Sequence, residues 1–428
     1  MTNTAITAIP ARRKAGNATQ AIRQPKKARK DTVSGAALKP DTHGQVFTPA
    51  SLVKEMMALR QNTGRILEPS CGSGAFSNGL HEAGADLVAL ELDQSHAPDY
   101  AKVVDFFDYP ITERFMTIVG NPPYLRHQDI PQATKAKLDM ALFDGRTNLY
   151  LFFIEKCIRH LDDGGELIFV VPRGLPKATA AHKLNRWLFE QGTITDFWET
   201  GDECLFAGAN PPCCVFRFVK GQMDRTMTDG RVFAEHEGQL FFLTAGATCV
   251  PLSSLFRVAV GGISGADHLY THPRGKLDVV CSTTAKTGKT RKMLDDGQAK
   301  RMLVKHKATL LARKVRRFTE DNWWTWGRGW KVSAAPRVYV NCKTRNAAPF
   351  FTSTGTAYDG SVLALFPKQD DLDPVQLAAI LNGVDWAGLG FCADGRFEFA
   401  QRALENVLLP EDVVSKLNQA VIQKKIGG

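Results

Sequence analysis

The sequence of 428 residues is 44% hydrophobic and 23% charged, which is typical of a folded globular protein. It contains no apolar run long enough to span a membrane and no apolar signal core near residue 1, so we expect no membrane attachment. Its nine cysteines include no C-x-x-C pair, which argues against a zinc site or a disulfide framework. We therefore expect a cytoplasmic protein without a bound metal.

Positive charge is concentrated at the two ends of the chain. Residues 1–40 contain nine Lys or Arg and one acid, and we expect them to form a disordered basic arm. Residues 41–220 have six more acids than bases, whereas residues 221–428 have eight more bases than acids. This asymmetry predicts a polyanionic partner that is held outside the central region. For the arm, a solvated tail that binds nothing is the alternative.

The folded part is expected to begin with a helix after Thr48-Pro49, because apolar residues recur at helical spacing over 52–57. We expect Thr48 to cap this helix and Pro49 to occupy its first position. A short strand over 66–68 then runs into Ser70–Gly74, whose glycines permit a tight turn and close approach of a ligand. A second helix should follow this turn.

Acidic residues stand at the ends of three successive expected strands. These are Glu68, Glu91 at the end of the strand 87–92, and Asp105 within the strand 103–107. Glu91 follows the glycine-bearing turn at about the distance at which nucleotide-binding sheets place an acid on ribose hydroxyls. A surface position is the ordinary explanation for each acid alone. Together they predict a ligand site at the carboxyl edge of the sheet.

The next expected strand, 117–120, ends in Asn121-Pro122-Pro123-Tyr124. Neither proline can donate a hydrogen bond to a neighbouring strand, and both have a fixed φ, so the turn is rigid. It presents the Asn121 amide, the Pro122 carbonyl and the Tyr124 ring at the edge where open α/β sheets bind ligands. An ordinary exit from a strand is the alternative.

Helices and strands continue to alternate up to residue 220. We expect helices over 148–161 and 177–191, with strands over 166–171, 195–199 and 214–219. Between the last two strands, Phe206 lies next to glycine in an expected loop. The succession predicts an α/β fold with a sheet of about seven strands.

The basic C-terminal half has its charge focused in residues 286–317, which contain twelve Lys or Arg and two acids. An aromatic cluster, Trp323-Trp324-Thr325-Trp326, follows closely. Cations with interleaved aromatic side chains are typical of a nucleic-acid surface, whereas a solvated helix face followed by core tryptophans is the alternative. Our candidates for contacting nucleic acid are Lys289, Arg291, Lys292, Arg313, Lys314, Arg316, Arg317, Arg345 and Arg396.

In this order, the residues resemble S-adenosylmethionine-dependent DNA adenine-N6 methyltransferases, in the subgroup whose cofactor motifs precede the catalytic motif. The resemblance implies a Rossmann-like class I methyltransferase domain over 41–220 and, more loosely, a mixed α+β target-recognition domain over 221–428. The segments that carry it are Phe47-Thr48-Pro49, Leu67–Phe76, Glu91, Asp105-Phe106, Asn121–Tyr124, Asn148-Leu149-Tyr150 and the Phe206 loop.

The resemblance also implies how S-adenosylmethionine is bound and how the target base is held. Asn121 and the Pro122 carbonyl would accept the amino hydrogens of a flipped-out adenine, and Tyr124 and Phe206 would stack on its faces. Core packing is the alternative for Phe206. The implied cofactor residues are Thr48 and Glu68 at the methionine end, the backbone of Ser70, Gly72 and Gly74 nearby, Glu91 at the ribose, Leu92, Asp105 and Phe106 at the adenine, and Pro123 and Phe153 as apolar walls.

On this interpretation the protein is an adenine-specific enzyme that acts as a monomer on double-stranded DNA, within or derived from a restriction-modification system. Any cognate restriction endonuclease would be a separate protein, because the arm of 40 residues is too short for a nuclease domain. An RNA or protein-glutamine methyltransferase with the same chemistry is one alternative, although such enzymes rarely need a large basic domain. A non-catalytic DNA-binding protein is another, although it would not need acids at the strand ends.

Overall fold

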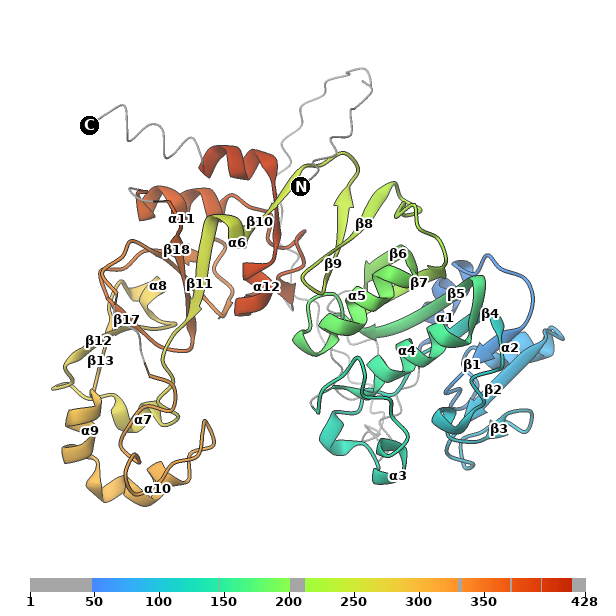
Figure 1. Cartoon of the computed structure of the whole chain (residues 1–428), viewed down its shortest axis with the longest axis horizontal. Helices are drawn as coiled ribbons and strands as arrows, with labels where there is room; N and C mark the ends of the chain where they lie inside the picture. The colour runs from blue at the N-terminus through green and yellow to red at the C-terminus, as the bar shows by residue number, and fades with distance from the viewer. Residues whose placement is uncertain are drawn as a thin grey trace, which may run out of the picture.

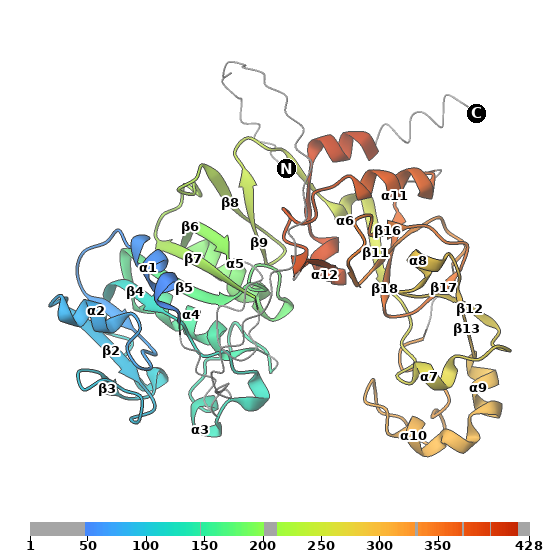
Figure 2. The same cartoon turned by 180° about the vertical axis from the view of Figure 1, so that it is seen from behind.

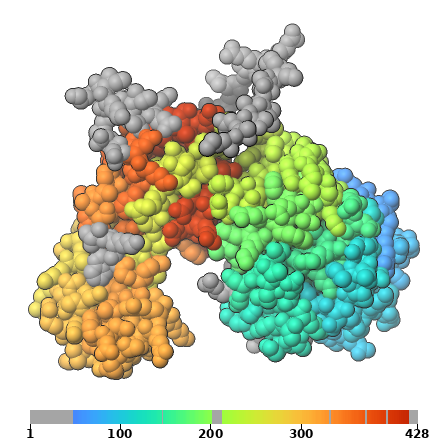
Figure 3. Space-filling model, viewed as in Figure 1, coloured from blue at the N-terminus to red at the C-terminus, as the bar shows by residue number. Residues whose placement is uncertain are grey.

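The computed structural model describes residues 48–145, 147–200, 212–329, 333–369, 372–393 and 395–417. These residues form two lobes that meet along one side and stand apart on the other (Figure 1). Figure 2 shows the same separation from behind, and Figure 3 shows an open hollow between the lobes. None of the described helices is long and apolar enough to cross a membrane.

The first lobe is built on a seven-stranded sheet, which confirms the predicted α/β fold. Its five leading strands run parallel, and β7 is antiparallel to both of its neighbours. The strand order is β3 (Lys102–Val103), β2 (Leu87–Glu91), β1 (Ile66–Glu68), β4 (Phe115–Gly120), β5 (Leu161–Pro172), β7 (Cys213–Lys220) and β6 (Gly192–Glu199).

Helices cover both faces of this sheet because its central strands alternate between two apolar cores. Ile66 and Val119 pack with α1 (Ala50–Ala58) and α2 (Ser77–Glu82) on one face. Leu67 and Ile118 pack on the other face with α4 (Leu149–His160) and α5 (His182–Gln191). A short helix, α3 (Gln132–Lys135), lies beyond β4. The sheet is therefore buried on both faces, so a ligand can reach it only at the ends of its strands.

Three local predictions in this lobe are wrong in detail. Pro49, not Thr48, is the N-cap of α1, and it makes no side-chain cap bond. The strand expected over 103–107 ends at Val103, because the Asp105 side chain instead caps a 3₁₀ turn over Phe106–Asp108. The helix expected over 177–191 begins only at His182, after a 3₁₀ turn.

The second lobe is a mixed α+β structure built from several small sheets. An antiparallel sheet has the order β11 (Phe256–Val260), β18 (Val362–Pro367), β14 (Val338–Asn341) and β16 (Phe350–Phe351). Smaller sheets comprise β13 (Arg291–Met293), β12 (Leu277–Val280) and β17 (Ala357–Tyr358); β15 (Lys343–Thr344), β20 (Arg396–Glu398) and β19 (Cys392–Ala393); and β10 (Cys249–Pro251) with β21 (Leu408–Pro410). The helices are α6 (Leu252–Leu255), α7 (Asp267–Tyr270), α8 (Thr284–Thr287), α9 (Asp296–Met302), α10 (Lys307–Leu311), α11 (Pro374–Asn382) and α12 (Gln401–Glu405).

A hairpin of β8 (Arg231–His236) and β9 (Gln239–Thr244) joins the cores of the two lobes. Because successive side chains of a strand point to opposite faces, Leu240 packs into the core of the first lobe and Phe241 into that of the second. The predicted boundary near residue 220 therefore precedes a hairpin that both lobes share.

Within the described residues of the first lobe, Arg217 and Glu166 form a buried ion pair, in which Arg217 Nε lies 2.6 Å from Glu166 Oε2. The other Glu166 oxygen accepts hydrogen bonds from the Asn62 amide at 2.9 Å and from Thr117 Oγ1 at 3.0 Å. The pair thus ties β5, β7 and β4 to the segment that follows α1.

Replacing Arg217 by Met should lower the free energy of unfolding by about 3–5 kcal/mol, because it leaves a buried carboxylate without its counter-ion. Urea unfolding measures this difference. The control is Arg126→Met, which removes the exposed partner of Asp129 and should cost about 1 kcal/mol or less. Equal losses in the two variants would contradict the assigned role of the buried pair.

Candidate functional site

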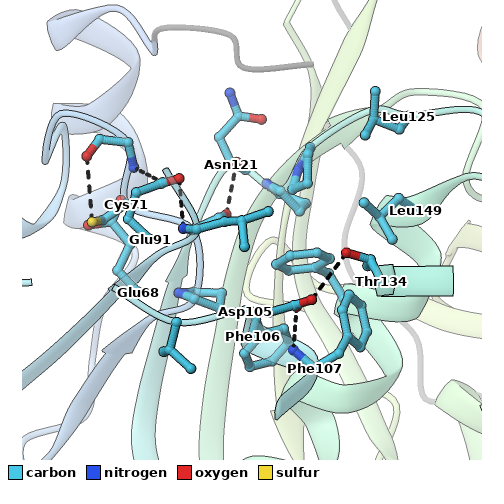
Figure 4. A pocket seen from close by; sticks show the side chains of 18 of the residues that line it. Glu68, Cys71, Glu91, Asp105, Phe106, Phe107, Asn121, Leu125, Thr134 and Leu149 are labelled. Atoms are coloured by element: carbon cyan, nitrogen blue, oxygen red, sulfur yellow. Dashed lines mark hydrogen bonds between the residues drawn. The ribbon is translucent and has the colours of Figure 1, made fainter. Parts of the chain in front are cut away.

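A cavity lies at the carboxyl ends of β1, β2 and β4 and has a volume of about 1020 Å³, including the part open to solvent (Figure 4). It brings together most of the residues predicted from the sequence. Twelve of them line it: Thr48, Glu68, Ser70, Gly72, Glu91, Leu92, Asp105, Phe106, Asn121, Pro122, Pro123 and Phe153. Gly74 and Tyr124 are not part of this lining, and Phe206 lies outside the described residues.

The turn after β1 is closed by its glycines and fastened to the next strand. Gly74 has φ +88°, and a Cβ there would lie 2.4 Å from Asn78 Oδ1, so a side chain would clash. The Gly72 amide donates to Glu91 Oε2 at 2.8 Å. The turn after β1 and the end of β2 are thereby held at a fixed separation across the cavity.

Glu91 is buried and organises the end of β2. Its other oxygen, Oε1, accepts the amide hydrogens of Leu92 at 2.8 Å and Asp93 at 2.9 Å. The next side chain, Leu92, is 49% exposed although it lies within the cavity. A fixed carboxylate beside an accessible apolar surface suits a ligand that carries hydroxyl groups next to a flat ring.

Glu68 is the most strongly perturbed acid of the site. Burial raises its pKa from the ordinary value of 4.5 to about 8, and hydrogen bonds from Ser77 oppose the rise. Its Oε2 atom has no hydrogen-bond partner within the described part of the chain. A buried acid oxygen at the wall of a cavity is a natural acceptor for a cationic ligand group.

Asp105 forms the opposite end of the cavity and is held by three donors. Its carboxylate accepts the Phe107 amide at 2.9 Å, Thr134 Oγ1 at 3.1 Å and Lys137 Nζ at 2.9 Å. Thr134 and Lys137 were not found from the sequence. Both lie in or just after the four-residue helix α3, which is too short to show an apolar period, and they reach Asp105 across about thirty residues of chain.

The Asn121–Tyr124 turn lies where β4 ends, between these two acidic regions. Asn121 Nδ2 donates to Thr48 Oγ1 at 3.2 Å, so the orientation of the amide group is set from the other side of the cavity. The Pro122 and Pro123 rings line the wall next to it. Figure 4 shows the Asn121 side chain projecting above the strand end, apart from the Asp105 cluster.

Tyr124 is held by its hydroxyl group, which donates to the Val170 carbonyl of β5 at 3.0 Å. Burial raises the pKa of this hydroxyl well above its ordinary range, so it stays protonated. The ring packs edge-on against Tyr150, with ring centroids 6.1 Å apart. The position of the ring is thus fixed from inside the sheet.

The predicted DNA-contact residues of the second lobe fall into two groups. Four are exposed with no ion-pair partner within the described chain: Lys289, Lys314, Arg317 and Arg345. The others have partners on the protein: Arg291 lies 3.7 Å from Asp359, Lys292 2.8 Å from Asp278, and Arg396 2.6 Å from Glu398, while Arg316 donates to Thr325 Oγ1.

Arg313 corrects one prediction outright. It is buried, and its guanidinium donates to the carbonyl oxygens of Leu310, Ser264, Trp323 and Thr325. All of these are main-chain atoms, so the cation joins three segments of the lobe and does not face DNA. Trp323 and Trp326 are likewise core residues, as the alternative interpretation held.

Known proteins resemble both the sequence and the fold. Residues 86–206 match the sequence model of the Eco57I restriction-modification methylase family. The type II methyltransferase M.TthHB8I of Thermus thermophilus is 32% identical over 267 residues, which span 53% of this chain and 60% of that protein. M.HincII of Haemophilus influenzae is 30% identical over 191 residues, or 42% of this chain and 38% of that protein.

The chain is therefore similar in sequence to restriction-modification methyltransferases. The chain matches 60% or less of the length of these two curated methyltransferase relatives. Across both lobes, the fold is similar to the type IIL restriction-modification enzyme MmeI, solved in complex with DNA, with a TM-score of 0.52 and 10% identity over 83% of this chain and 62% of that one. The methyltransferase fold expected for the first lobe is confirmed.

For the first lobe, the raised pKa of Glu68 predicts a stability that falls as pH rises. The folded state holds the Glu68 proton up to about pH 8, whereas the unfolded chain releases it near pH 4.5. Between these values the Glu68 contribution should fall by at most about 1.4 kcal/mol per pH unit. Glu68→Gln should remove that slope in urea unfolding at several pH values. Glu82→Gln, at an exposed site on α2, should keep it; a Glu68→Gln slope equal to wild type would contradict the assignment.

Proposed function

We propose that this protein is a DNA methyltransferase that transfers a methyl group from S-adenosylmethionine to the N6 amine of adenine. One observation carries the proposal: the Asn121-Pro122 turn and the acids Glu68, Glu91 and Asp105 line one cavity. A rigid acceptor pair thus adjoins a site shaped for a nucleoside that carries a cationic group. The sequence similarity to type II methyltransferases supports DNA as the substrate.

The cavity has groups that suit each part of S-adenosylmethionine. The buried Glu68 and Thr48 would hold the methionine end, and Glu91 would accept from the ribose hydroxyls. The exposed face of Leu92 would pack against the purine, and Asp105 with the Phe106 amide would recognise its edge. The apolar walls are Pro123 and Phe153, whose ring lies 4.9 Å from that of Phe106. When bound, the cofactor supplies an electrophilic methyl group on a sulfonium.

The adenine amine is a poor nucleophile because its lone pair is delocalised into the ring. The Asn121 side-chain oxygen and the Pro122 carbonyl would accept its two hydrogens and so localise the lone pair on nitrogen. The hydrogen bond from Asn121 Nδ2 to Thr48 leaves the amide oxygen as the acceptor. This chemistry needs no strong general base, since the amine loses its proton after transfer.

An adenine inside a duplex must leave the stack to reach this edge, at a cost of a few kcal/mol. Stacking on Tyr124, and on Phe206 as proposed from the sequence, would return about 1–3 kcal/mol for each ring. The anchored hydroxyl of Tyr124 suits this role because a fixed ring loses little entropy when a base packs on it.

The hollow between the lobes is the proposed place for the double helix (Figure 3). Exposed cations of the second lobe, among them Lys289, Lys314, Arg317 and Arg345, would contact phosphates and position the duplex. The protein would act as a monomer, and any cognate restriction endonuclease would be a separate protein.

Labelled S-adenosylmethionine, offered with unmethylated genomic DNA, with RNA and with protein, tests the substrate. Label recovered in N6-methyladenine of DNA is the expected result. Label in cytosine, in RNA or in protein-bound glutamine would overturn the proposal, and the absence of any transfer would leave a DNA-binding protein without catalysis.

Asn121→Ala should lower kcat by at least about 10²-fold, because it removes one of two acceptors aimed at the reacting nitrogen. Binding of S-adenosylhomocysteine, measured by calorimetry, should stay within a few-fold of wild type. Asn121→Asp is the matched variant: it keeps an acceptor oxygen and should retain measurable transfer. Near-native turnover in Asn121→Ala would refute the assigned role.

A further inference from the structure

The loop between β5 and α5, residues 173–181, connects the second lobe to the edge of the sheet where Asn121 and Tyr124 lie, which we call the target-base edge. It begins just after Val170, whose carbonyl anchors the Tyr124 hydroxyl. At its start, Arg173 Nη1 lies 3.0 Å from Glu199 Oε2 at the end of β6. Further along, the Pro176 carbonyl accepts the Leu240 amide of the shared hairpin at 2.9 Å. The loop thus touches the proposed catalytic edge at one end and the junction of the lobes at the other.

Lys177, in the middle of this loop, reaches into the second lobe. Its Nζ donates to the Leu389 carbonyl and lies 3.9 Å from the centroid of the Phe391 ring. Gly390 leaves room for it: a Cβ at this position would lie 2.9 Å from Lys177 Nζ, and the φ of +73° also favours glycine. A single long side chain therefore fixes the loop against residues 389–391.

Beside the apolar residues of the hairpin, several polar side chains near this contact have only some of their hydrogen bonds satisfied. His182 Nε2, Asn185 Oδ1 and Gln239 Oε1 are buried without a hydrogen-bond partner among the described residues. The partners of the two amides are main-chain atoms, since Gln239 donates to the Arg402 carbonyl and Asn185 to those of Leu175 and Gly238, whereas His182 Nδ1 lies 3.5 Å from Arg402 Nη1. Unsatisfied polar groups reduce the free energy gained when the two surfaces pack together. A single specific contact therefore has more influence on how the lobes are placed.

We propose that Lys177 is a positioning residue that couples the recognition lobe to the target-base edge of the sheet through its contact with residues 389–391. The inference rests on the proposed function and deepens it. Duplex held by the second lobe would be placed relative to Asn121 by this contact. Weakening the contact should therefore slow methyl transfer while leaving the cofactor site intact, because that site is built entirely from the first lobe.

The environment of Lys177 gives the contact a pH dependence. Burial lowers the pKa of its amine to about 7, and the charge of Glu199 opposes this effect. Around it, His182 lies 3.5 Å from Arg402, Arg173 is paired with Glu199, and Asp385 accepts the Gly388 amide. Opening the contact would return the amine to its ordinary pKa of 10.5, so opening takes up a proton between pH 7 and 10.5. Within that range, lower pH favours the open arrangement.

The test compares wild type with Lys177→Met, Gly390→Ala and the double variant, using a DNA fragment that the wild type methylates. Lys177→Met should lower kcat about tenfold or more, because a small misplacement of the target is costly. Its affinity for S-adenosylhomocysteine should stay within twofold of wild type. The double variant should be no slower than the slower single variant, because both changes break one contact. The control is Lys183→Met, at an exposed site on α5.

Hydrogen exchange reports the same contact without substrate. The amides of residues 389–391 should lose protection in wild type as the pH falls from 10 toward the Lys177 pKa of about 7, but not in Lys177→Met. Wild-type kcat in Lys177→Met, losses that multiply in the double variant, or equal pH dependence of exchange in both proteins would overturn the inference. A wild type that methylates no DNA would instead defeat the proposed function, and exchange alone would then decide the role of Lys177.

Discussion

The site depends on one constraint, the parallel pairing of β1 with β2 and with β4. Leu67 is in register with Val88 on one side and with Ile118 on the other, so Glu68, Glu91 and Asn121 leave the sheet at one edge. The hydrogen bond from the Gly72 amide to Glu91 then closes the glycine turn across that edge. Without this register, the acids and the acceptor turn would not share a cavity.

Electrostatics separates the two ends of the cavity into different tasks. Glu68 is buried, has an oxygen without a partner in the described chain and has a raised pKa, so it is ready to gain from a cation. Asp105 instead already accepts from Lys137, Thr134 and an amide, which fixes its direction. A polar ligand edge would meet an oriented acceptor at Asp105, whereas a cationic ligand group at the other end would offset the desolvation cost of the Glu68 carboxylate. Similar side chains thus acquire different chemistry from their surroundings.

Features that follow from short-range sequence could be predicted, and those that depend on distant contacts could not. Glu91, Asp105 and the Asn121 turn each adjoin a recognisable strand end, and the structure places them in one cavity. By contrast, charge at Arg313 gave no indication that four carbonyl oxygens would surround it. The contact of Lys177 with Leu389 spans 212 residues, and no local pattern encodes it.

The two lobes differ in the same way, because the candidate site is built within the first lobe and the position of the second lobe depends on contacts between distant residues. In the first lobe, strand pairing and local side-chain hydrogen bonds set the positions of the candidate groups, so the cavity is formed without any residue of the second lobe. The second lobe is joined to it through the β8–β9 hairpin, whose alternating side chains enter both cores, and through a polar seam around Lys177. On the proposed function, the second lobe would place DNA relative to Asn121 through these two connections, whereas the cofactor site would lie wholly within the first lobe.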